Sequence, residues 1–136
     1  MGTLEIIQWI IRGVFALAFI GMGISHFRPK PARMMAAMIP PALRGVGPLS
    51  PERLVWITGI CEVAGGVGLL VPAGVVPFVQ VAAAVALILF LVAVFPANAY
   101  AAANPERFGS LAIPLMPRLL AQVAMIGLLG VTLLAA

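Results

Sequence analysis

The sequence predicts an all-α fold, a four-transmembrane-helix bundle with a short amphipathic helix in the first long loop. Of the 136 residues, 63% are hydrophobic and 9% are charged, whereas soluble domains carry about 25% charged residues. Four apolar segments, residues 4–25, 54–71, 75–97 and 115–135, are each long enough to cross a hydrocarbon layer of about 30 Å as a helix. We therefore expect a single integral membrane domain over residues 1–136.

The first segment, residues 4–25, carries its polar residues on one stripe. Glu5, Gln8 and Arg12 lie on the same helical face, and that face continues to His26 at the far end. A polar stripe along an apolar helix indicates a face that points into the bundle. The segment lacks a basic start and a small-x-small cleavage site, so we interpret it as a retained helix.

The first long loop, residues 26–50, is punctuated by five prolines, and a short helix is predicted between them at 32–39, started by Pro31. This helix carries Met34, Met35 and Met38. Methionines beside a histidine can bind copper(I), but a methionine-rich helix at a membrane surface more often packs against lipid or core. No metal site is therefore predicted.

The second segment, residues 54–71, contains Glu62 within an otherwise apolar stretch. A charged residue near the centre of a bilayer costs about 2.5 to 3.5 kcal/mol, so such residues face protein or a polar cavity. The face around Glu62 is rich in small residues and consists of Val55, Thr58, Gly59, Gly65, Gly66 and Leu69. The opposite face is aliphatic and consists of Ile57, Ile60, Ala64, Val67 and Val71. Glu62 is expected to point into the bundle.

The third and fourth segments supply further polar groups. The short Pro72–Gly74 turn predicts that residues 75–97 form an antiparallel hairpin with the second helix, and Pro96 is expected to end or bend the third helix beside Asn98. On residues 115–135, Arg118 and Gln122 share one face. At about 1.5 Å per residue from the loop side, Glu62 lies roughly 15 Å deep, Gln122 roughly 10 Å and Arg12 roughly 20 Å.

Glu62 therefore has two candidate partners, Arg118, whose side chain can extend inward, and Arg12. The candidate intramembrane site comprises Glu62, Arg118, Gln122, His26, Asn98 and Arg12. Each member also has a structural interpretation: Glu62 as a protonated or ion-paired residue, Arg12 as a partner of Glu5 or Gln8, and His26 as a polar anchor.

The net charge of +4 comes from basic residues at helix ends and in loops, which indicates membrane topology and lipid headgroups rather than nucleic acid. Both long loops carry the basic residues and are expected to be cytoplasmic. The single cysteine, Cys61, excludes an internal disulfide. No motif for haem, flavin or an iron-sulfur cluster is visible in the sequence, so electron transfer would require a partner protein.

The sequence resembles the DoxX family of small four-helix bacterial membrane proteins. The motifs that carry the resemblance are residues 21–27 (GMGISHF), 59–70 (GICEVAGGVGLL), 95–98 (FPAN), and Arg118 with Gln122. The family pattern often has a proline between that arginine and glutamine, whereas here the nearest proline is Pro117, before the arginine. The resemblance implies a bacterial cytoplasmic membrane protein, with relatives connected to sulfur oxidation, the quinone pool or oxidant defence.

Three functions remain open at this stage. The favoured one is a redox-linked or accessory membrane subunit that binds a quinone-like or other small ligand without a covalently bound cofactor, with a membrane or redox protein as partner. The alternatives are a non-enzymatic scaffold, whose polar cluster fixes helix register, and a small transporter, which would have to form a homo-oligomer. Whether the chain is an enzyme is not predicted.

Overall fold

The computed structural model describes residues 1–45 and 47–135, and every regular element in these ranges is helical. The elements in chain order are α1 (Thr3–Ser25), α2 (Pro29–Met38), η1 (Pro41–Leu43), α3 (Pro51–Leu70), α4 (Val79–Ala103), α5 (Pro105–Phe108), η2 (Gly109–Leu111) and α6 (Leu115–Val131). In the described residues, four helices are long and apolar enough to cross a membrane, the last counted from Pro105 to Val131. The predicted all-α class with four long apolar helices is confirmed at this level.

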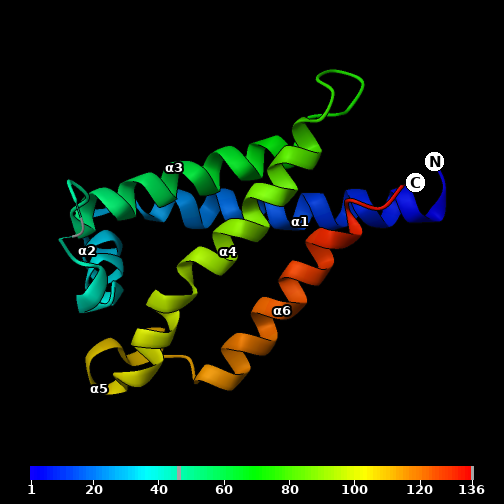
Figure 1. Ribbon diagram of the computed structural model, residues 1–136. Helices are drawn as coiled ribbons and strands as arrows, with labels where there is room; N and C mark the ends of the chain where they lie inside the picture. Colours follow the sequence, from blue (N-terminus) through cyan, green and yellow to red (C-terminus); the bar gives the residue numbers. More distant parts are fainter. Residues whose placement is uncertain (46, 136) are drawn as a thin grey trace.

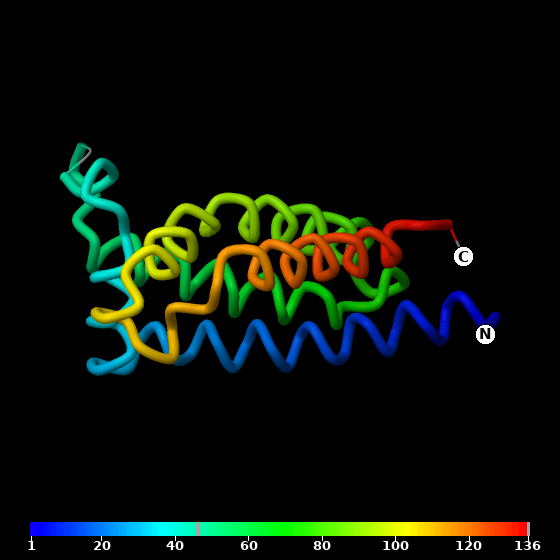
Figure 2. Tube along the Cα trace, turned by 90° about the horizontal axis from the view of Figure 1, so that it is seen from below, coloured from blue at the N-terminus to red at the C-terminus, as the bar shows by residue number. Residues whose placement is uncertain are grey.

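α1 and α3 lie side by side, α4 and α6 cross them obliquely in Figure 1, and the short elements lie towards one end (Figures 1 and 2). α1 packs against α3, α3 against α4, and α4 against α6. The two termini lie at the end opposite to α2 and α5 (Figure 1). The molecule therefore has a loop end, formed by residues 26–50 and 104–114, and a terminal end, which also holds the connection 71–78.

Glycines let α1 and α3 approach each other at backbone distance. A Cβ atom on Gly23 would lie 2.7 Å from a methyl group of Val63 and 2.9 Å from the carbonyl oxygen of Gly59. Further along, a Cβ atom on Gly66 would lie 3.1 Å from the carbonyl oxygen of Ala16. Small residues allow this packing between apolar helices. The pairing of 23 with 59 and of 16 with 66 makes the two helices antiparallel.

The inward faces predicted for the first two long helices are confirmed. On α3 the buried residues are Val55, Gly59, Glu62, Gly65, Gly66, Gly68 and Leu69, and on α1 they are Gln8, Ile11, Arg12, Phe15, Ala16, Phe19 and Gly23. The aliphatic side chains of Ile57, Ile60 and Val67 on the opposite face of α3 are exposed. An apolar cluster that includes Phe15, Phe19, Leu69, Leu87 and Leu129 fills the middle of the bundle.

The helices of the loop end begin earlier than the sequence predicted. α2 begins at Pro29 rather than near Pro31, because the first amide that must donate within the helix is that of Ala32, to the carbonyl of Arg28. Both prolines therefore occupy positions where a missing N–H costs nothing. α3 begins at Pro51 rather than at 54, where the apolar segment begins. Pro-Glu-Arg at 51–53 is the sequence signal for this helix start, which is confirmed, and Ser50 is the N-cap that accepts from the amide of Arg53.

The third long helix departs most from the prediction. It was expected at 75–97, but α4 begins only at Val79, because Phe78 has a left-handed backbone conformation with φ of 68° that a helix cannot include. It also continues through Pro96 to Ala103. Proline removes one hydrogen bond, and the alanine-rich segment after it favours helix strongly enough to continue. The prediction that the helix ends at 97 was wrong.

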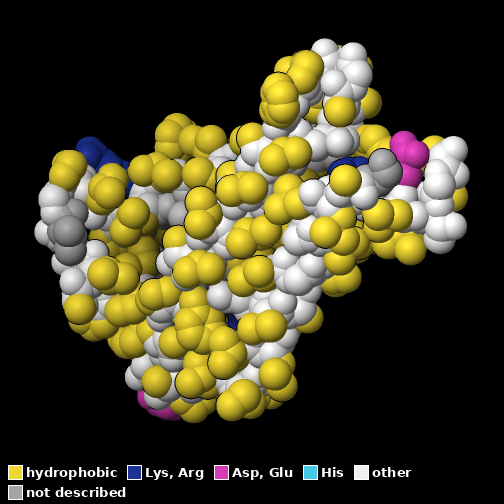
Figure 3. All heavy atoms as spheres, turned by 45° about the vertical axis from the view of Figure 1, so that its right-hand side comes forward, with side chains coloured by type: hydrophobic (Ala, Val, Ile, Leu, Met, Phe, Trp, Pro, Cys, Tyr) yellow, Lys and Arg dark blue, Asp and Glu magenta, His cyan; other side chains and the backbone are white. Residues whose placement is uncertain are grey.

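The fourth long helix, α6, ends at Val131 and not at 135. The amide side chain of Gln8 donates to the carbonyls of Val131 and Leu134, and the guanidinium of Arg12 donates to the carbonyl of Thr132. Side chains of α1 thus satisfy carbonyls that further helical turns would otherwise have occupied. Apolar side chains cover most of the face shown in Figure 3, and charged ones are found mainly towards its ends.

The close approach of α1 and α3 makes a paired test available. We expect Gly23→Ala to destabilise the protein by about 1–3 kcal/mol, because the added Cβ overlaps Val63 and the backbone of Gly59. Gly21→Ala, two residues earlier on α1, adds its Cβ to open space and should leave stability unchanged or slightly raised. The measurement is thermal unfolding of the purified variants in detergent. Equal stability of the two variants would contradict the packing described.

Candidate functional site

A cavity of about 870 Å³ opens at the loop end between α2, α3, α4 and α6. Most of its wall is apolar, with Met34, Met35 and Met38 contributed by α2 and Phe90 by α4. The methionines read from the sequence as packing residues therefore form one wall of this cavity. Ligand sites typically combine such an apolar wall with a few polar groups that fix orientation. Here the polar groups include His26, Thr58, Glu62, Asn98 and Arg118.

The central polar feature is a close pair between His26 and Glu62. Nε2 of His26, which directly follows α1, lies 2.7 Å from Oε2 of Glu62 on α3, and both side chains are nearly buried. Oε2 accepts no well-aligned hydrogen bond from the residues described, so the contact is a short ion pair rather than a linear hydrogen bond. The pair joins the two helices at the point where their glycines bring them closest.

The partner of the second ring nitrogen of His26, Nδ1, shows that this nitrogen carries a hydrogen. Nδ1 lies 2.8 Å from the carbonyl oxygen of Val55, and a carbonyl can only accept, so Nδ1 carries a hydrogen. The hydroxyl of Thr58 lies 3.1 Å from the same nitrogen and itself donates to carbonyls of the preceding turn. When His26 is protonated, Nε2 carries the second ring hydrogen and lies 2.7 Å from the carboxylate oxygen Oε2 of Glu62.

The arginines do not pair with Glu62 in the described residues, which corrects the expectation from depth. The ion-pair partner of Glu62 is His26. Arg118 is half-buried and lines the same cavity as Glu62, and its Nε is buried without a hydrogen-bond partner among the described residues. Arg12 lies at the terminal end, where it donates to Thr132. The predicted cluster is thus divided between the two ends of the molecule.

Two other predicted members are placed differently. Asn98 lines the cavity from α4, two residues after Pro96. Gln122 is buried on α6, with 6% of its surface exposed, but it is not among the residues that line the cavity. Of the six predicted residues, His26, Glu62, Asn98 and Arg118 are brought together, and Gln122 and Arg12 are not.

The depths predicted for Glu62 and the arginines were wrong because each was counted from the loop end of its own helix, as if all helices began at one level. α3 begins at Pro51, yet Gly59 is the residue that packs against Gly23 near the end of α1. The first two turns of α3 therefore extend roughly 12 Å beyond the last turn of α1, at 1.5 Å per residue. Glu62 consequently lies level with His26, and the shorter reach of a histidine is sufficient.

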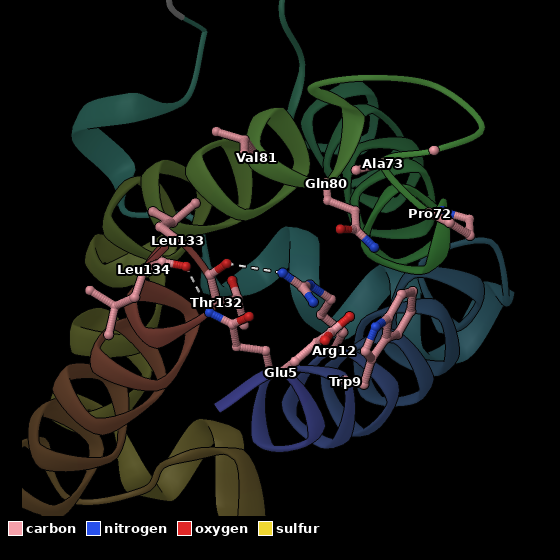
Figure 4. A pocket seen from close by; sticks show the side chains of 12 residues that line it. Glu5, Trp9, Arg12, Pro72, Ala73, Gln80, Val81, Thr132, Leu133 and Leu134 are labelled. Atoms are coloured by element: carbon pink, nitrogen blue, oxygen red, sulfur yellow. Dashed lines mark hydrogen bonds between the residues drawn. The ribbon is translucent and has the colours of Figure 1, made fainter. Parts of the chain in front are cut away.

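Sequence analysis also missed the polar surroundings of Arg12. A second cavity of about 490 Å³ lies at the terminal end, between the first half of α1, the start of α4 and the end of α6 (Figure 4). Its polar wall is formed by Glu5, Gln8, Arg12, Gln80 and Thr132. The spacing of Glu5, Gln8 and Arg12 on one face signalled this site, but nothing in the sequence showed that Gln80 and Thr132 would meet it.

The comparisons with known proteins identify a family. A family model described as Domain of unknown function (DUF8561) matches residues 15–130. The chain belongs to this family. No curated protein and no solved structure matched the chain. The matching model is not that of the DoxX family, so the resemblance to DoxX proteins stays an expectation from the motifs quoted above.

The His26–Glu62 pair predicts that stability depends on pH. Burial of the imidazole disfavours its charge, but the Glu62 carboxylate and the Val55 carbonyl outweigh this, and the pKa of His26 lies above its usual 6.5. Because the pKa is raised on folding, protonation of His26 stabilises the fold fully below about pH 6.5, and this contribution is lost as the pH rises through the folded-state pKa.

We expect the thermal stability of the protein in detergent to fall as the pH rises from 6 towards 8, and His26→Gln to remove that dependence. Glu52→Gln, an exposed change of charge on the same helix as Glu62, should retain it. The measurement is the melting temperature as a function of pH. A wild-type profile that is flat, or that rises over this range, would contradict the assignment.

Proposed function

We propose that this chain is a multi-pass protein of the bacterial cytoplasmic membrane that binds a quinone-like ligand in the loop-end cavity, as a redox-linked or accessory membrane subunit. The observation that carries the proposal is the arrangement of His26, Glu62 and Arg118 at the wall of a largely apolar cavity. In this placement the four long helices cross the membrane, and both basic loops face the cytoplasm. The extensive apolar surface then contacts lipid.

The chemistry of the cavity suits a ligand with an apolar body and a head that accepts hydrogen bonds. The methionines of α2 provide a polarisable, adaptable wall for such a body. The guanidinium of Arg118 has a buried Nε–H without a partner among the described residues, which can donate to a ligand carbonyl. Buried donors of this kind favour ligands that satisfy them.

The His26–Glu62 pair adds a proton next to the ligand head. Conversion of a quinone to a quinol takes up two electrons and two protons, and the electrons come in this proposal from a partner redox protein. The pair supplies the two protons one at a time at the cavity wall and regains each from the loop side, where His26 lies at the end of α1. The chain then contributes binding, orientation and proton supply.

A scaffold function is the competing candidate, and one observation favours it. The His26–Glu62 pair joins α1 to α3 where their backbones are closest, so the pair also suits a role in fixing helix register. Arg118 distinguishes the two functions. A residue that fixes helix register would bond to another helix, but the buried Nε of Arg118 has no hydrogen-bond partner among the described residues.

The test is binding of decylubiquinone to the purified full-length chain in detergent, measured by isothermal titration calorimetry. The wild type is expected to bind with saturation at one site. Glu62→Gln and Arg118→Gln should each weaken binding by about tenfold or more, which corresponds to loss of a hydrogen bond to a charged group. Glu52→Gln and Arg33→Gln are the matched controls, since both residues are exposed and lie outside the cavity wall.

The outcomes separate the two functions. If the wild type shows no saturable binding, the quinone proposal fails. If the variants bind as the wild type does but melt at a lower temperature, the scaffold function is supported instead. Loss of binding in a folded Arg118→Gln variant would exclude a purely structural role for the cavity.

A further inference from the structure

The terminal-end cavity is a second polar site, independent of the cavity that carries the proposed function. Its volume is about 490 Å³, and its walls come from α1, the 71–78 connection, α4 and the residues after α6. Apolar side chains of the central cluster, among them Phe19, Leu87 and Leu129, lie between the two ends of the bundle. The two cavities share no lining residue, so they can be tested separately.

Arg12 is the group in this cavity that indicates a ligand. The residue is 8% exposed and carries a guanidinium with five N–H donors. Its Nη2 donates to the carbonyl oxygen of Thr132 at 3.0 Å, while its Nε is buried without a hydrogen-bond partner in the described residues. A buried charged donor without a partner is costly, and an acceptor that reaches it would relieve that cost.

The surroundings hold the guanidinium in one place. The indole of Trp9 lies beside it, with Cζ of Arg12 5.3 Å from the ring centroid. Gln8 donates to the carbonyls of Val131 and Leu134, so those acceptors are occupied by another side chain. Figure 4 shows Arg12 reaching from α1 towards Thr132, with Gln80 across the opening. Arg12 is thus positioned in advance, with donors to spare.

Glu5 does not neutralise Arg12 by direct contact. Its carboxylate acts on Arg12 electrostatically, but no ion pair joins the two side chains. Glu5 is also less buried than Arg12. Glu5 lines the same cavity as Arg12, and without an ion pair between these two side chains the remaining guanidinium donors stay available to a ligand.

We propose that the terminal-end cavity binds an oxyanion of the phosphate type through Arg12. The planar fork of a guanidinium matches two oxygens of such a group, and a charge-assisted hydrogen bond of this kind is stronger than one between neutral groups. The oxyanion is either a free anion or the headgroup of a phosphate-bearing lipid, because both present the same oxygens. Binding of either compensates the charge of the buried guanidinium and uses donors that the bond to Thr132 leaves free.

Trp9 provides the measurement, because it stacks on Arg12. The chain contains one other tryptophan, Trp56, which is exposed and packs against Phe27. In the Trp56→Phe background, the fluorescence of Trp9 reports on the site. The purified full-length chain in neutral detergent micelles is titrated with inorganic phosphate and, separately, with dioleoylphosphatidic acid, with dioleoylglycerol as the phosphate-free control lipid.

We expect a saturable change in Trp9 fluorescence with at least one phosphate-bearing probe and none with dioleoylglycerol. A response to inorganic phosphate identifies a free anion as sufficient, and a response to phosphatidic acid alone identifies a lipid headgroup. Saturation by neither probe overturns the proposal. Failure of decylubiquinone binding at the other cavity has no bearing on this result.

Two variants separate ligand binding from the capping of α6. Glu5→Gln removes a negative charge beside the site and should tighten phosphate binding by roughly tenfold, as expected for loss of a like charge in a partly buried site. Arg12→Lys keeps the positive charge but removes Nε and the planar fork, and should abolish the saturable change. Glu52→Gln at the loop end should have no effect. An unchanged affinity in Glu5→Gln would overturn the proposal even if Arg12→Lys does not fold.

Discussion

The backbone approach of α1 and α3 is the constraint on which the rest of the structure depends. With glycine at 23, 59 and 66, the two helices come close enough for His26 to reach Glu62. An arginine has a longer side chain than histidine, so an arginine–glutamate pair would not need helices this close. The same approach sets the vertical offset by which α3 extends beyond α1. That extension, together with α2, forms the wall of the loop-end cavity. The packing of α1 against α3 therefore also determines the geometry of the loop-end cavity.

Among the described residues, the buried polar groups that line a cavity lie at the two ends of the molecule, whereas Gln122 is buried within α6 and lines neither cavity. His26 and Glu62 lie at the loop end, and Gln8 and Arg12 lie at the terminal end, with Phe19 and its neighbours between them. The terminal group closes α6 onto α1 through side-chain bonds to backbone carbonyls. Each end thus combines a structural contact with a cavity, which is why a single polar residue can serve both packing and binding.

How far the sequence could predict these features depended on the kind of signal. Helical periodicity correctly identified the inward faces of α1 and α3, because burial follows spacing along one helix. It could not show which faces meet at which level, since offset between helices depends on contacts such as that of Gly23 with Gly59. For that reason Glu62 was matched with arginines and not with His26. The end of α4 was misjudged because one proline weighs less than the alanine-rich turns that follow it.

The His26–Glu62 pair is difficult to explain by stability alone. Taking a charged pair out of water costs several kcal/mol per ion, and well-packed apolar residues of similar size usually stabilise a core as well or better. The contacts of Gly23 with Val63 and of Gly66 with Ile20 show that this sequence supplies apolar packing between α1 and α3. A titratable pair that borders a largely apolar cavity, which Arg118 also lines, offers chemistry that apolar residues cannot provide. This balance favours a ligand at the loop end over a purely structural pair.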